Sequence, residues 1–122
     1  MDTSDGLFVP VLRDAGNRSP DHLRAEIDRL WEAVNQRSLT PEDMKGATFT
    51  LSNFGTIGGR HASLVIVPPQ VAILGAGRVI GAQSSAHAGM LPLSLTFDHR
   101  AATGGDAARF LTAVREDLER AE

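Results

Sequence analysis

The chain has 122 residues, of which 42% are apolar and 22% are charged, and its formal charge at pH 7 is −3. These values are typical of one globular domain and exclude intrinsic disorder, and the negative charge argues against binding to a nucleic-acid backbone. The absence of cysteine excludes disulfides and thiolate metal sites. No apolar run approaches the ~20 residues of a membrane span, and the acidic start is unlike a signal peptide, so we expect a cytoplasmic protein.

The first part of the chain is predicted to contain one strand and two helical segments. Residues 6–12 are apolar, partly β-branched and followed by a turn, which predicts a strand. Ser19, Pro20 and Asp21 form a helix-start signal, and residues 40–43 repeat it for a short helical turn that ends at Gly46. The first helix is expected to bury apolar residues at helical spacing, namely Leu23, Ile27, Leu30 and Val34, with Trp31 widening that face.

From residue 47 onward the pattern changes to that of strands. Strands are predicted at 48–52, 63–67, 71–74 and 90–97, with 63–67 and 71–74 buried, and loops at 53–59 and 81–89. A final helix is predicted from about Gly105, with Ala107, Phe110, Leu111, Val114 and Leu118 on its apolar face and Asp106 at its positive end. Strands between two amphipathic helices predict an α+β sandwich with helices on one face of a sheet.

Asp98, His99 and Arg100 directly follow the predicted strand 90–97. An imidazole at a strand end, between a carboxylate and a guanidinium, is placed for proton transfer near neutral pH, although an ordinary surface turn has the same pattern. His22, His61 and His87 lack such a setting. Because the four histidines are scattered and no cluster has ligand spacing, no metal site is expected.

Two glycine-rich segments follow predicted strands. Residues 75–81 resemble a dinucleotide-binding turn, but the third glycine is one residue late and no helix is predicted to follow, so these glycines are interpreted as sites of tight bends or close backbone approach. Ser52 and Asn53 end a strand before the other glycine loop. They are either hydrogen-bond donors to an oxyanion or ordinary turn residues.

Several of these segments occur together in the order found in one family. The chain resembles the catalytic domain of the dihydrolipoamide acyltransferases, the core components of the 2-oxoacid dehydrogenase complexes, from residue 2 almost to its end. The segments that carry the resemblance are 2–11, Leu-Thr-Pro-Glu-Asp at 39–43, Gly-Ala-Thr-Phe-Thr-Leu-Ser-Asn-Phe-Gly at 46–55, Val-Ala-Ile-Leu-Gly at 71–75 and Leu-Pro-Leu-Ser-Leu-Thr-Phe-Asp-His-Arg at 91–100.

The resemblance implies a chloramphenicol-acetyltransferase-like sandwich, assembled as trimers whose active sites lie between subunits and which build cubic or dodecahedral cores. It also implies acyl transfer between the thiols of dihydrolipoamide and coenzyme A, with His99 as general base and Ser52 as the hydroxyl that stabilises the oxyanion, from across the interface. Asp98 and Arg100 are expected to orient the loop or to pair between subunits. The family motif usually has an acid four residues after the histidine, where this chain has Thr103, which is expected either to order the loop by local hydrogen bonds or to weaken the site.

The family's catalytic domain is about twice as long as this chain, near the upper size of single-core domains. We therefore expect a C-terminal part of that domain, a partial sandwich with helices on a mixed sheet, which self-associates through uncovered strand edges. Lys45, the only lysine, lies outside any lipoylation motif. The lipoyl group is therefore expected on a separate domain, and contacts with the decarboxylase and dihydrolipoamide dehydrogenase components are expected through domains that this sequence does not contain.

Two alternatives remain open at the level of sequence. One is a non-catalytic scaffold or core subunit of the same complex, and the other is a relative that acylates a different small acceptor. Acetyl, succinyl and branched-chain acyl groups are distinguished by pocket shape rather than by the motifs above. Arg60 and Arg78 are candidates for contact with the phosphates of coenzyme A.

Overall fold

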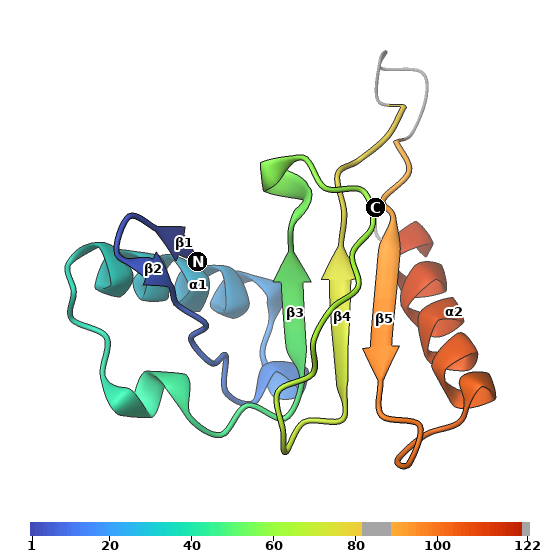
Figure 1. Cartoon of the computed structure of the whole chain (residues 1–122). Coiled ribbons are helices and arrows are strands. Elements are labelled where there is room, and N and C mark those ends of the chain that lie inside the picture. Colours follow the sequence, from blue (N-terminus) through green and yellow to red (C-terminus); the bar gives the residue numbers. More distant parts are fainter. Residues whose placement is uncertain (82–88, 121–122) are drawn as a thin grey trace. The chain divides into compact units, whose positions relative to one another are not determined.

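The computed structural model describes residues 1–81 and 89–120, which form two compact units, Met1–Ala47 and Thr48–Glu122 (Figure 1). Each unit contains one long helix, and the second contains a mixed sheet, so the predicted α+β class is confirmed. In the described ranges no helix is both long and apolar enough to span a membrane.

The first unit begins with a small hairpin, in which β1 (Asp2–Thr3) pairs with β2 (Gly6–Leu7) in antiparallel fashion. The predicted strand at 6–12 is therefore wrong beyond Leu7. The hydroxyl of Thr3 donates a hydrogen bond to the Gly6 carbonyl (2.9 Å), and Gly6 has a φ of 125°, so the chain reverses early. Beyond β2, Pro10 has no N–H to give to a ladder, and the Val11 N–H donates to the Asp43 carbonyl (2.8 Å).

The predicted helix is confirmed as α1 (Pro20–Asn35), with Ser19 accepting the His22 N–H (3.3 Å) as its N-cap. Leu30 and Val34 are buried. Trp31 is 39% exposed, so the expectation that it widens the buried face is wrong, since it lies about 100° around the helix from Leu30. The short helical turns of this unit are η1 (Ala15–Asn17) and the predicted η2 (Pro41–Met44), which ends before Gly46.

The second unit is built on a three-stranded sheet in the order β3 (Thr50–Asn53), β4 (Ala72–Ala76), β5 (Leu93–Phe97). β3 is parallel to β4, and β5 is antiparallel to it, so the three strands lie side by side as Figure 1 shows. β4, the central strand, contains the buried residues Ile73 and Leu74. Outside this sheet, Ile80 and Met90 form an isolated antiparallel β-bridge. β5 begins at Leu93, whereas the sequence predicts a strand from residue 90.

The predicted final helix is confirmed as α2 (Gly104–Arg120), which packs against β5 (Figure 1). Its Phe110 ring lies 5.7 Å from the ring of Phe49, at an interplanar angle of 58°. Leu51 of β3 is 65% exposed. An apolar side chain of the sheet therefore remains uncovered in the second unit.

The predicted buried strand at 63–67 is wrong, because this segment pairs with no strand in the part of the chain that the structure describes. Its side chains still alternate: Leu64 and Ile66 are half-buried, whereas Val65 is 80% and Val67 is 64% exposed. Leu64 reaches over Gly75 at the centre of the sheet, so the segment lies across a sheet face. Most of the predicted loop 81–89, including His87, lies outside the described residues.

The glycines after β3 and β4 allow backbones to touch. A Cβ on Gly77 would lie 2.2 Å from the Arg60 carbonyl oxygen, and one on Gly55 would lie 2.5 Å from the Gly77 carbonyl oxygen. η3 (Gly55–Ile57) occupies the loop predicted after β3.

Candidate active site

His99 lies in the turn that joins β5 to α2, and its side chain is exposed. The turn is tied to the sheet at its first residue, where the Asp98 N–H donates to the Val71 carbonyl (2.8 Å). It closes on itself through the Ala101 N–H, which donates to the Asp98 carbonyl (2.9 Å). The imidazole of His99 lies 5.5 Å from the ring of Phe97, at an interplanar angle of 41°. The imidazole is therefore accessible to a substrate on a turn whose backbone is fixed.

Asp98 and Arg100 flank His99 and bind each other. The Asp98 carboxylate accepts the Arg100 backbone N–H (2.9 Å) and also the guanidinium, at 2.6 Å from Nη2. These hydrogen bonds lower the pKa of Asp98 to about 2 and raise the pKa of Arg100. The pair therefore stabilises the turn within one chain.

Thr103 ends the same turn and caps α2. Its hydroxyl and its backbone N–H both donate to one carboxylate oxygen of Asp106, at 2.7 and 2.9 Å, and the Asp106 N–H donates back to the hydroxyl (3.2 Å). The bonds from Thr103, with a further one from Arg109, lower the pKa of Asp106 to about 2. This reciprocal arrangement is a capping box, so Thr103 forms local hydrogen bonds that connect the turn to α2.

Ser52 lies in β3, half-buried, on a different part of the sheet. Its register partner on β4 is Gly75, whose partner on β5 is Ser94. From Ser94 to Asp98 the chain runs four residues away from this row, about 13 Å at strand spacing, and His99 lies beyond Asp98. The structure therefore does not bring Ser52 and His99 of one chain together.

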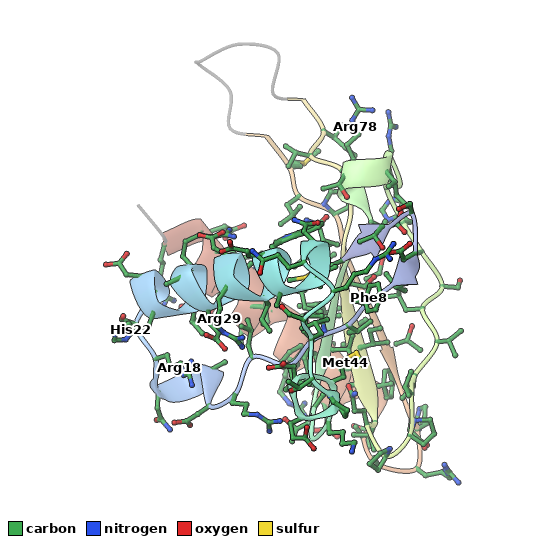
Figure 2. All side chains as sticks on the ribbon, turned by 90° about the vertical axis from the view of Figure 1, so that its left-hand side faces the viewer. Phe8, Arg18, His22, Arg29, Met44 and Arg78 are labelled. Atoms are coloured by element: carbon green, nitrogen blue, oxygen red, sulfur yellow. The ribbon has the colours of Figure 1, made fainter. Side chains whose placement is uncertain are left out.

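Other candidate residues lie apart from this turn. Asn53 accepts the Gly55 N–H (3.1 Å) and so acts as a turn residue. His22 lines a hollow of about 470 Å³ together with Arg18, Ala25, Glu26 and Arg29, and Figure 2 shows His22 and Arg29 on α1 and Arg18 at the end of the short turn η1. Arg29 is neutralised there by Glu26 (2.8 Å), whose pKa it lowers. Over the described ranges, no group of three His, Cys, Asp or Glu residues is arranged to hold a metal ion.

Asp106 lies near the site, but the sequence analysis assigns this residue only to the helix dipole and does not connect it with the turn of His99. The signal was present, because a threonine followed three residues later by an acid before an apolar stripe is the pattern of a capping box. In the structure this box connects the turn of His99 to α2.

Comparison with known proteins identifies the family. Residues 1–122 match the family described as 2-oxoacid dehydrogenases acyltransferase (catalytic domain). The chain is 37% identical to the dihydrolipoyllysine-residue acetyltransferase component of the pyruvate dehydrogenase complex of Corynebacterium glutamicum, over 99% of this chain and 19% of that protein. It is 40% identical to the corresponding protein of Buchnera aphidicola, over 97% of this chain and 31% of that protein.

Comparison with solved structures identifies the same family. The dihydrolipoamide acetyltransferase of Azotobacter vinelandii, studied for the role of a serine, a histidine and an asparagine in its catalytic mechanism, is 38% identical with a TM-score of 0.86. The match covers 98% of this chain and 51% of that one. A probable dihydrolipoamide acetyltransferase from Listeria monocytogenes is 30% identical with a TM-score of 0.89, over 98% and 53% of the two chains.

The chain therefore belongs to the family of 2-oxoacid dehydrogenase acyltransferases, within its catalytic domain. It spans less than a third of the length of these curated relatives and about half of the solved chains. In the Azotobacter protein the asparagine follows the histidine by four residues, which is the spacing of Thr103 from His99 here.

Proposed function

We propose that this chain takes part in acyl transfer between the thiol of dihydrolipoamide and the thiol of coenzyme A. The observation that carries the proposal is the exposed His99 on a turn fixed at both ends, by Asp98 to Val71, which directly precedes β4, and by Thr103 to α2. Membership of the acyltransferase family supports it. The lipoyl group would arrive on a separate domain, since Lys45 is the only lysine of the chain.

His99 is proposed as the general base. Its imidazole takes the proton of the attacking thiol, the thiolate adds to the thioester carbonyl, and the tetrahedral intermediate expels the other thiolate, which recovers the proton. A free thiol and a free imidazole differ by about two pKa units, so this transfer is inexpensive. Asp98 is bound to Arg100 and serves to hold the turn rather than to accept the proton.

Ser52 is proposed to donate its hydroxyl hydrogen to the oxyanion, a contact worth about 2 to 4 kcal/mol in the transition state. Because Ser52 and His99 of one chain lie on separate parts of the sheet, the two residues meet only if they come from different copies. We therefore propose a homo-oligomer, a trimer in which each active site lies between two subunits, as in the cores of this family.

The test is thioester formation from acetyl-coenzyme A and dihydrolipoamide by the purified chain, beside His99→Ala and Ser52→Ala. We expect His99→Ala to abolish turnover and Ser52→Ala to lower it roughly 10²- to 10³-fold. Arg115→Gln, on the exposed side of α2, is the control and should retain full activity.

Mixing the two inactive variants tests the shared site. When His99→Ala and Ser52→Ala subunits are dissociated and reassembled together, random mixing should restore intact sites in roughly a quarter of the interfaces. Activity that stays at the level of the separate variants would show that the residues act within one chain. A parent that assembles without any turnover would favour the alternative, a non-catalytic core subunit.

A further inference from the structure

Two arginines, Arg60 and Arg78, are brought together by direct backbone contact at the end of the sheet where β3 and β4 stop. The Arg78 N–H donates to the Gly59 carbonyl (2.7 Å), and Gly77 lies so close to Arg60 that a Cβ would be 2.2 Å from its carbonyl oxygen. The start of η3 closes the same contact, since a Cβ on Gly55 would lie 2.8 Å from the Arg78 nitrogen.

The glycines at this contact have no room for side chains, so the backbones of Arg60 and Arg78 lie close together. Both arginine side chains are exposed. Figure 2 shows Arg78 extending beyond the strands beside the short helix η3. The two exposed guanidinium groups therefore start from neighbouring backbone positions, and each carries several N–H donors.

The charge of these arginines is not neutralised by the protein. In the second unit Arg100, Arg109, Arg115 and Arg120 all have a carboxylate within 4.0 Å, whereas Arg60 and Arg78 form no ion pair with any described residue. The sequence gives the reason: between Asp43 and Asp98 it contains no aspartate or glutamate. In a chain whose net charge is −3, this end of the sheet is a local positive site.

We propose that Arg60 and Arg78 together bind a phosphate group of a nucleotide substrate. The inference rests on the proposed function, which supplies coenzyme A as that nucleotide. A phosphate accepts several charge-assisted hydrogen bonds at once, and two planar guanidinium groups satisfy its geometry better than two ammonium groups. The site binds and positions the nucleotide and takes no part in proton transfer.

The experiment measures binding without turnover, by titration calorimetry of the full 122-residue chain with coenzyme A. Losing one charge-assisted contact is expected to weaken binding about tenfold. Arg60→Gln and Arg78→Gln should therefore each raise the Kd for coenzyme A by that factor, and the double variant should raise it further. Arg115→Gln removes the same charge elsewhere in the second unit and should bind as the parent does. Circular dichroism of each variant confirms that the helices remain folded.

The source of the phosphate is distinguished by dephospho-coenzyme A, which lacks the 3′-phosphate. If the arginines bind the 3′-phosphate, parent and double variant should bind this compound equally; if they bind the diphosphate, the difference between them should persist. Equal binding of coenzyme A by parent and double variant would overturn the proposal, as would an equal loss in Arg115→Gln or no binding by the parent. Because no turnover is measured, failure of acyl transfer leaves this result standing.

Discussion

The turn that holds His99 is restrained by residues close to it in the sequence. The ring centroids of Phe97 and His99 lie 5.5 Å apart, Asp98 and Arg100 on either side of His99 are hydrogen-bonded to each other, and Thr103 connects the turn to α2. Each contact uses a residue within four positions of His99. A general base gains from such restraint, since a small misplacement of the reacting atoms costs a large part of the rate.

The capping box predicts how stability changes with pH. The pKa of Asp106 in the folded chain is about 2, below its ordinary value of 3.8, so the stabilisation is complete above about pH 4 and is lost as the pH falls through 2. Thermal unfolding followed at 222 nm from pH 5 to pH 2 should therefore show a falling Tm in the parent.

Asp106→Asn should have a lower Tm at pH 5 and a smaller loss on acidification. Asp117→Asn, on the same helix but outside the capping box, is the control and should follow the parent. If Asp106→Asn and the parent lose Tm in parallel down to pH 2, the carboxylate does not stabilise this turn.

At the scale of elements, the close backbone contacts at the end of β4 leave no space for a methyl group. Gly77→Ala would place a carbon 2.2 Å from the Arg60 carbonyl oxygen, so the backbone must shift. Overpacking of this kind costs about 1 to 3 kcal/mol. Chemical denaturation should show this loss in Gly77→Ala, whereas Gly16→Ala, which meets nothing within 4 Å, should be close to the parent. A Gly77→Ala variant as stable as the parent would mean that Gly77 and Arg60 are not in contact.

The elements that the sequence predicted well are those whose ends carry local signals. Ser19 and Pro20 mark the start of α1, and Thr40 marks η2, because a cap is made by side chains within three residues of the backbone that they bind. The apolar run at residues 63–67 was misleading, since such a run is typical of a buried strand but does not show whether a partner strand exists. Likewise, the separation of Ser52 from His99 depends on strand register, which neither segment encodes alone.

At the scale of the whole molecule, much apolar surface remains exposed relative to the buried core. Leu30, Val34, Ile73 and Leu74 are the buried apolar residues of the described chain, whereas Leu7, Leu51, Ile57, Val65 and Met90 are each more than half exposed. Burial of such surface against a second copy is strongly favourable, at about 25 cal/mol per Å².

We therefore predict that the chain self-associates. Light scattering over a wide concentration range should give a mass above 13.0 kDa. Val65→Lys with Val67→Lys should reduce association, because charges on an exposed extended segment oppose pairing with another chain. Thr112→Lys with Ala113→Lys, both at exposed positions of α2, adds the same two charges elsewhere and should leave association unchanged. A monodisperse monomer at every concentration would contradict the prediction.

The pairing of the three strands has a consequence for the speed at which the second unit folds. β3 is parallel to β4, so residues 54–71 must return along the sheet before that ladder can form, with Thr50 paired to Ile73. The antiparallel ladder also joins distant residues, since Ala76 pairs with Leu93. Closing a long connection costs entropy before the hydrogen bonds of the ladder form. We therefore expect this sheet to form more slowly than either long helix.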